Sequence, residues 1–115
     1  MTPYEFVSKL GAAVVDENHA IYRDVLLHTH ADQAPDPYWQ RVLTLFGTLD
    51  ADQREVLLEL TRQVTIDAVA NVLGVIDGNC MLSDERGGLS LTHQGVELGG
   101  ELQSLFLEIA EHSEP

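Results

Sequence analysis

The chain has 115 residues, 44% of them hydrophobic, which suits one domain with a modest core and argues against extensive disorder. Six Lys and Arg stand against 19 Asp and Glu, and the resulting formal charge of −13 disfavours nucleic-acid backbones and anionic membrane surfaces as partners. The single cysteine excludes an internal disulfide, and the sequence shows neither a secretory signal pattern nor an apolar run of membrane-spanning length. We therefore expect one domain over residues 1–115, located in the cytoplasm.

The first predicted helix begins at the N-terminus of the sequence. Thr2-Pro3-Tyr4-Glu5 combines an N-cap threonine, a proline at the first helical position and a glutamate that completes a capping box. Apolar residues at helical spacing then carry the helix to about His28. Gly11 and Asp16 are the two places where we expect it to break or bend.

The end of this helix carries a candidate metal motif. His28-Thr29-His30-Ala31-Asp32 resembles the start of the zinc site in one class of metallohydrolase, which begins His-x-His-x-Asp. The chain supplies neither the further ligands nor the alternating strands and helices that such a fold requires. We expect the histidines to serve the negative C-terminal end of the helix instead, and we predict no metal site and no cofactor.

A second, shorter helix is predicted from Asp36-Pro37 to Gly47. It begins with the same combination of a capping residue and a proline. Trp39, Val42 and Phe46 share one face, which we expect to enter the core. The short connection that follows predicts antiparallel packing against the next helix.

The longest predicted helix spans residues 50–76, and we expect the other elements to pack around it. Asp50 and Gln53 form a capping box at its start, and Asp77-Gly78 ends it. In the first half, one stripe of apolar residues is expected to face the core, namely Val56, Leu57, Leu60 and Val64. The second half is apolar in almost every direction, which predicts a largely enclosed helix.

Two polar residues interrupt this pattern. Asp67 and Asn71 lie one turn apart on the line that continues Leu60 and Val64. A polar residue on a core-facing line needs hydrogen-bond partners, so we expect Asp67 and Asn71 to form a buried structural network. The polar floor of a ligand cleft and a solvent-facing edge are the two alternatives.

The last third of the sequence predicts short strands followed by a helix. Apolar pairs and turn residues over about 80–98 favour a small antiparallel β-hairpin or three short strands, with turns at residues 83–88 and at Gln94-Gly95. A final helix is predicted from about Glu101 to His112. A start near His93 is the alternative, but it would place Gly99 and Gly100 inside the helix at a cost of about 2 kcal/mol. The expected fold class is α+β, mainly α, with about four helices.

The final helix carries the main functional hypothesis. Glu101, Ser104, Glu108 and Glu111 recur at helical spacing opposite the apolar face. Acidic residues near a helix C-terminus oppose the helix dipole, so folding alone does not explain them. They form either an acidic ridge that binds a basic surface or an ordinary solvated face.

Three functions are compatible with these features. The leading hypothesis is a non-catalytic, intracellular protein-binding domain that docks on a basic partner through Glu101, Glu108 and Glu111. Immunity proteins and antitoxins share its small size and acidic charge. The second is a self-associating structural or adaptor domain, as a homodimer. The third, a metal-dependent enzyme using His, Asp or Glu of the first helix with Asp67, has no complete motif to support it.

Overall fold

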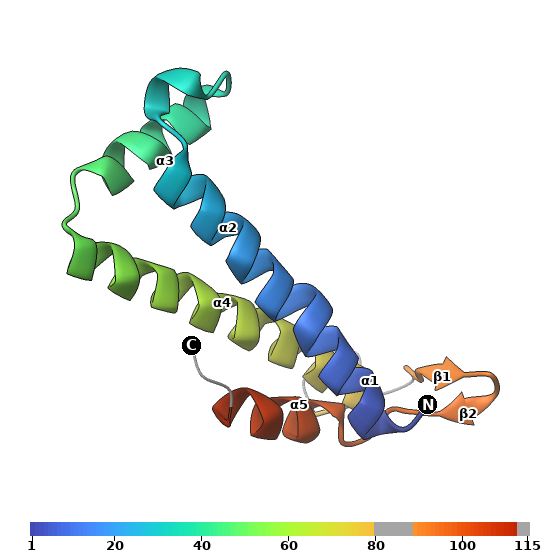
Figure 1. The fold of residues 1–115 in the computed structure, drawn as a ribbon. Helices are drawn as coiled ribbons and strands as arrows, with labels where there is room; N and C mark the ends of the chain where they lie inside the picture. The colour runs from blue at the N-terminus through green and yellow to red at the C-terminus, as the bar shows by residue number, and fades with distance from the viewer. Residues whose placement is uncertain (80–88, 113–115) are drawn as a thin grey trace.

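The computed structural model describes residues 1–79 and 89–112 (Figure 1). The first helical segment runs without a break through α1 (Pro3–Leu10), a π-helical turn η1 (Gly11–Asp16) and α2 (Glu17–His28). The Thr2 hydroxyl accepts a hydrogen bond from the backbone N–H of Glu5, at 3.1 Å, as the capping pattern predicts. Between Gly11 and Asp16, where a break or bend was expected, the helix widens into the π-helical turn and continues.

The two middle helices follow their predicted limits closely. After a 3₁₀ turn, η2 (Ala31–Gln33), α3 spans Pro37–Gly47 and α4 spans Ala51–Asp77. Both bonds of the α4 capping box are present, from Gln53 N–H to the Asp50 carboxylate and from Asp50 N–H to the Gln53 side chain. Gly78 ends α4 in the left-handed conformation, with φ of 85°, which only glycine adopts without strain.

The C-terminal part contains a hairpin and the last helix. The strands β1 (Thr92–His93) and β2 (Val96–Glu97) pair antiparallel around Gln94-Gly95, both of which have positive φ. The expected first strand, near Met81, lies outside the described residues. The last helix, α5, spans Leu102–Glu111, so the alternative start near His93 is wrong because that residue belongs to the hairpin.

An acidic side chain from α4 caps the start of α5. The Asp77 carboxylate accepts hydrogen bonds from the backbone N–H groups of Gly100, Leu102 and Gln103, at 2.7, 3.1 and 2.7 Å. These N–H groups have no partner inside the helix. A residue that the sequence marks only as the end of α4 therefore also holds α5 in place.

The chain is elongated and has two separate hydrophobic clusters. In Figure 1, α2 and α4 diverge from the end where α1 and α5 lie, and α3 connects their far ends. One cluster joins α1, η1, α4 and α5, and the other joins α2, α3 and the start of α4. The radius of gyration is 17.5 Å, whereas a compact chain of this length has about 13 Å.

The fold class agrees with the prediction. Of the residues that the structure describes, 75% are helical, and a small two-stranded antiparallel sheet accompanies the helices, which makes the fold α+β and mainly α. Residues 50–76 lie in one helix with its cap, as expected. The prediction that this helix is largely enclosed is wrong, however, because Val72 in its second half is 60% exposed and one side of its first half also reaches solvent.

Candidate protein-binding surface

The exposed side of α4 is an apolar line of three residues. Val56, Leu60 and Val64 follow one another at intervals of four and are 63%, 56% and 59% exposed. We call this line the α4 stripe. The sequence predicted that it faces the core, and this is wrong: the buried face of α4 carries Leu58 and Ile66 instead.

Arg62 is the reason that the pattern of apolar residues predicts the wrong buried face for α4. It interrupts the sequence of apolar residues on the buried face, so a charge appears where a core residue is expected. The structure nevertheless buries Arg62, which is 9% exposed and reaches the Asp16 carboxylate at 3.4 Å. An arginine can pack its aliphatic stem along apolar surface, so its charge did not prevent burial.

The polar network expected at Asp67 and Asn71 is not buried. Both residues are exposed on the side of α4 that carries the α4 stripe. Asp67 accepts a hydrogen bond from the Gln63 side-chain amide at 2.9 Å, within the same helix. The prediction of a buried network is therefore wrong, and its alternative, a solvent-facing edge, describes these residues.

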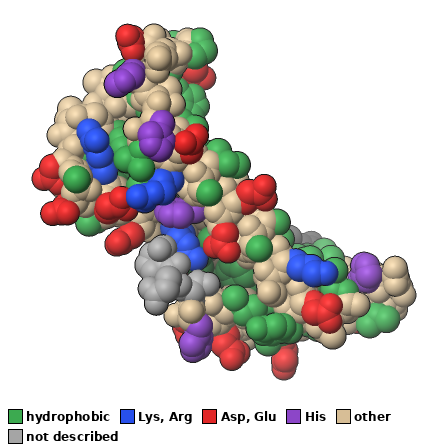
Figure 2. Space-filling model, in the orientation of Figure 1, with side chains coloured by type: hydrophobic (Ala, Val, Ile, Leu, Met, Phe, Trp, Pro, Cys, Tyr) green, Lys and Arg blue, Asp and Glu red, His purple; other side chains and the backbone are tan. Residues whose placement is uncertain are grey.

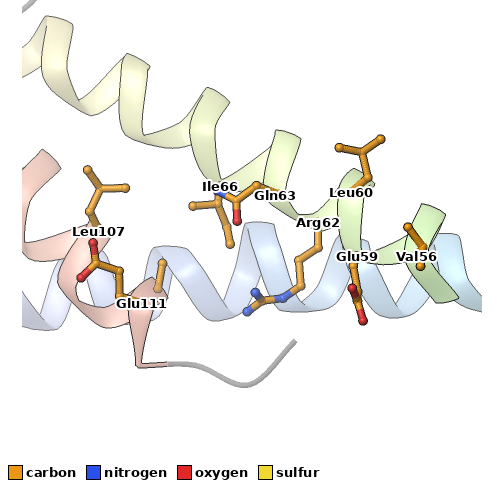
Figure 3. Close-up of a pocket in the computed structure, with 9 residues that line it drawn as sticks. Val56, Glu59, Leu60, Arg62, Gln63, Ile66, Leu107 and Glu111 are labelled. Carbon is orange, nitrogen blue, oxygen red and sulfur yellow. The ribbon is translucent and has the colours of Figure 1, made fainter.

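A groove opens where α5 stops alongside α4. Because α5 is the shorter helix, it covers only the second half of α4 (Figure 1). The groove, which we call the α4–α5 groove, has a volume of about 590 Å³. Figure 3 shows the side chains around it, and its apolar lining is contributed by both helices: Val56, Leu60, Ile66, Leu107 and Ala110.

Charged side chains from both helices border the apolar part of this groove, and Arg62 of α4 is one of them. Glu59 of α4 and Glu111 of α5 both line it. Of the predicted acidic ridge, Glu101, Glu108 and Glu111 are all exposed, but only Glu111 reaches the groove. Glu101 lies before α5, about 15 Å of helix rise from Glu111. Glu108 lines a different hollow, beside Tyr4. The sequence did not indicate that Glu59 and Glu111 line the same groove.

A second groove separates α2 from α4. It has a volume of about 430 Å³, and we call it the α2–α4 groove. Its lining is mostly apolar, with His19 and Arg62 also in its wall. Arg23 of α2 donates two hydrogen bonds to Glu55 of α4, at 2.6 and 2.8 Å, and ties the two helices together. This pairing lowers the pKa of Glu55 and raises the pKa of Arg23.

The candidate metal motif does not assemble a ligand set within the described residues. His28 pairs with Asp24 at 3.0 Å near the end of α2, and His30 precedes η2. No group of three His, Cys, Asp or Glu side chains in residues 1–79 and 89–112 is placed to hold an ion. Nor does this part of the chain contain a helix with the length and apolar character needed to cross a bilayer.

Comparison with protein-family models, with curated proteins and with solved structures found no match to this chain.

Proposed function

We propose that this chain is a non-catalytic binding domain that docks on a basic protein partner, and that the α4–α5 groove receives an amphipathic helix of that partner. The exposed α4 stripe carries the proposal. Val56, Leu60 and Val64 are each more than half exposed on a regular helix, beside a groove with an apolar lining. Contiguous exposed apolar surface is typical of protein interaction sites. A helix laid beyond the end of α5 would continue the packing of α5 on α4.

The charges around the groove favour a basic partner. Glu59 and Glu111 line it from its two helices, and Asp52 and Asp67 are exposed on α4. Arg62 is the one cation among the described residues that line the groove, so carboxylates are in excess. Lysine or arginine flanking the apolar face of a partner helix would meet these carboxylates. The charge of −13 would also speed the encounter with a cationic surface.

A second copy of the chain fits this surface less well. Pairing two α4 stripes would bring Glu59 and Asp67 of each copy into one interface, and like charges oppose that contact. A small acidic domain that binds a basic partner also matches the physical profile of an immunity protein or antitoxin. This class, the absence of catalysis and a cytoplasmic location remain predictions.

Two designed helical peptides provide the first test. Both carry leucines at helical spacing, but one has lysines on the flanks and the other has glutamates. Calorimetry at low salt should detect binding of the lysine peptide only, and raising the salt should weaken it. Equal binding of both peptides would contradict the proposal.

Variants then locate the binding surface. Val56→Asn should weaken binding of the lysine peptide about tenfold, because it removes an apolar contact that lines the α4–α5 groove and not the α2–α4 groove. Leu45→Asn is the matched control: Leu45 is 62% exposed but lies on α3, outside the groove, and binding should stay within twofold. Glu111→Gln should reduce the salt dependence more than Glu101→Gln. If the Val56→Asn and Leu45→Asn variants bind the lysine peptide equally well, the α4–α5 groove is not the binding surface.

A further inference from the structure

Arg62 has more hydrogen-bonding capacity than its surroundings use. Its guanidinium carries five N–H donors. Within the described part of the chain, one side-chain hydrogen bond is present, from Nη2 to an Asp16 carboxylate oxygen at the long distance of 3.4 Å. Arg62 is 9% exposed, while the Asp16 side chain is 62% exposed and mostly solvated. A buried charge with a weak partner is costly, and such groups mark functional sites.

His19 is a second incompletely paired group in the same place. Its Nδ1 atom is buried and has no hydrogen-bond partner among the described residues. His19 and Arg62 line the same α2–α4 groove, one from each helix. Figure 2 shows Arg and His side chains between α2 and α4, with Asp and Glu side chains directly beside them. Arg62 and His19 therefore give the groove wall two groups that can bind an anion, with the Asp16 carboxylate close to Arg62.

The backbone is also irregular beside Arg62. The π-helical turn Gly11–Asp16 ends at the residue that pairs with Arg62. Single π-helical turns inside α-helices occur frequently at functional sites. This observation is independent of the weakly paired Arg62 and of the unpaired His19 Nδ1, and it points to the same position.

The rest of the groove is suited to an apolar group. Tyr22, Leu60 and Val64 form its open part, and its volume of about 430 Å³ falls in the range of small-molecule sites. A ligand that matches both parts needs an anionic head for Arg62 and His19 and an apolar body for the open part. We propose that the α2–α4 groove binds a small amphipathic carboxylate, with its carboxylate hydrogen-bonded to Arg62.

The overall negative charge does not prevent this binding. Salt screens charges beyond about 8 Å at physiological ionic strength, so the distant carboxylates act weakly on a bound ligand. Arg62 and a carboxylate form a charge-assisted hydrogen bond, which is among the stronger polar contacts in proteins. Arg62 is held by the Asp16 carboxylate at the long distance of 3.4 Å, so a bound carboxylate would replace or join that contact.

Trp39 supplies a built-in signal for the test. It is the only tryptophan, and its ring lies 6.0 Å from that of Tyr22 in the groove wall. Titration with octanoate should change Trp39 fluorescence to a plateau. Octanol has the same apolar body without the charge and should bind at least tenfold more weakly. Equal affinities, or no saturable change with octanoate, would overturn the proposal.

Arg62→Met should remove the preference for octanoate over octanol, because it keeps the stem and deletes the guanidinium. Arg41→Met changes the charge equally on an exposed arginine of α3 and should bind as the parent does. Circular dichroism establishes whether each variant is folded.

Asn18→Asp decides the matter if Arg62→Met does not fold. Asn18 is exposed and lines the α2–α4 groove but not the α4–α5 groove. A carboxylate there should weaken octanoate binding about tenfold and leave octanol unaffected. Asn71→Asp makes the same change outside the groove and should have no effect. If octanoate binds Asn18→Asp as tightly as it binds the parent protein, the site is wrongly placed. Lysine-peptide binding is a separate measurement, so either proposal can fail alone.

Discussion

At the residue scale, Asp77 makes the clearest prediction about stability. Its carboxylate accepts three backbone hydrogen bonds at the start of α5. Asp77→Ala leaves those N–H groups without their acceptor and should lower the free energy of unfolding by about 2 kcal/mol. Urea denaturation measures the change. Asp67→Ala is the control. It should change the free energy of unfolding by no more than about 0.5 kcal/mol, because Asp67 is exposed and hydrogen-bonded only within its own helix. Equal losses for the two variants would contradict this assignment.

The same two aspartates show the limit of prediction from sequence for single residues. Asp67 interrupts an apolar pattern, which suggested burial, and Asp77 precedes a glycine, which suggested only a helix end. What separates them is contact with a segment more than twenty positions away, and neither composition nor spacing encodes that contact. Arg62 is a third case, since its charge predicted exposure and its neighbours bury it.

At the element scale, the start of α4 depends on a local motif. Asp50 accepts the Gln53 N–H at 2.8 Å, and the Gln53 side chain returns a bond to Asp50 at 2.9 Å. Asp50→Ala should lower the stability by about 1 kcal/mol. Asp52→Ala removes the same charge from the same helix end but no capping hydrogen bond. It should therefore lower the stability by only a few tenths of a kcal/mol. Thermal unfolding of both variants compares them, and the capping role fails if Asp52→Ala is the more damaging change.

Helix limits were therefore predictable, and so was the face by which α3 enters the core, but the buried face of α4 was not. The ends of α3 and α4 follow from proline, capping residues and glycine, all of which act within a few positions of one another. Which face of α4 is buried depends on where α1, α2 and α5 pack. The α4 stripe and the true core face are both apolar by spacing, so periodicity alone could not choose between them. The α4–α5 groove has the same origin, because it exists only where α5 ends against α4.

At the scale of the whole molecule, elongation and charge act together. The chain measures 49 × 31 × 24 Å and divides its core into two clusters, where the sequence suggested one core around a central helix. This shape leaves the α4 stripe exposed. It also spreads the carboxylates over a larger distance than a compact chain would, which limits the repulsion that a net charge of −13 produces.

Salt should nevertheless stabilise the protein. Increasing NaCl from about 20 to about 300 mM shortens the screening length from about 20 to about 6 Å and weakens repulsion among the carboxylates. It also weakens ion pairs such as Arg23–Glu55, but exposed pairs contribute little, so repulsion should dominate. Calorimetry should show a Tm that rises by a few degrees. The double variant Glu108→Gln and Glu111→Gln should have a higher Tm than the parent protein at low salt, and its Tm should rise less as NaCl is added. A Tm that falls with salt would mean that the ion pairs outweigh the net charge.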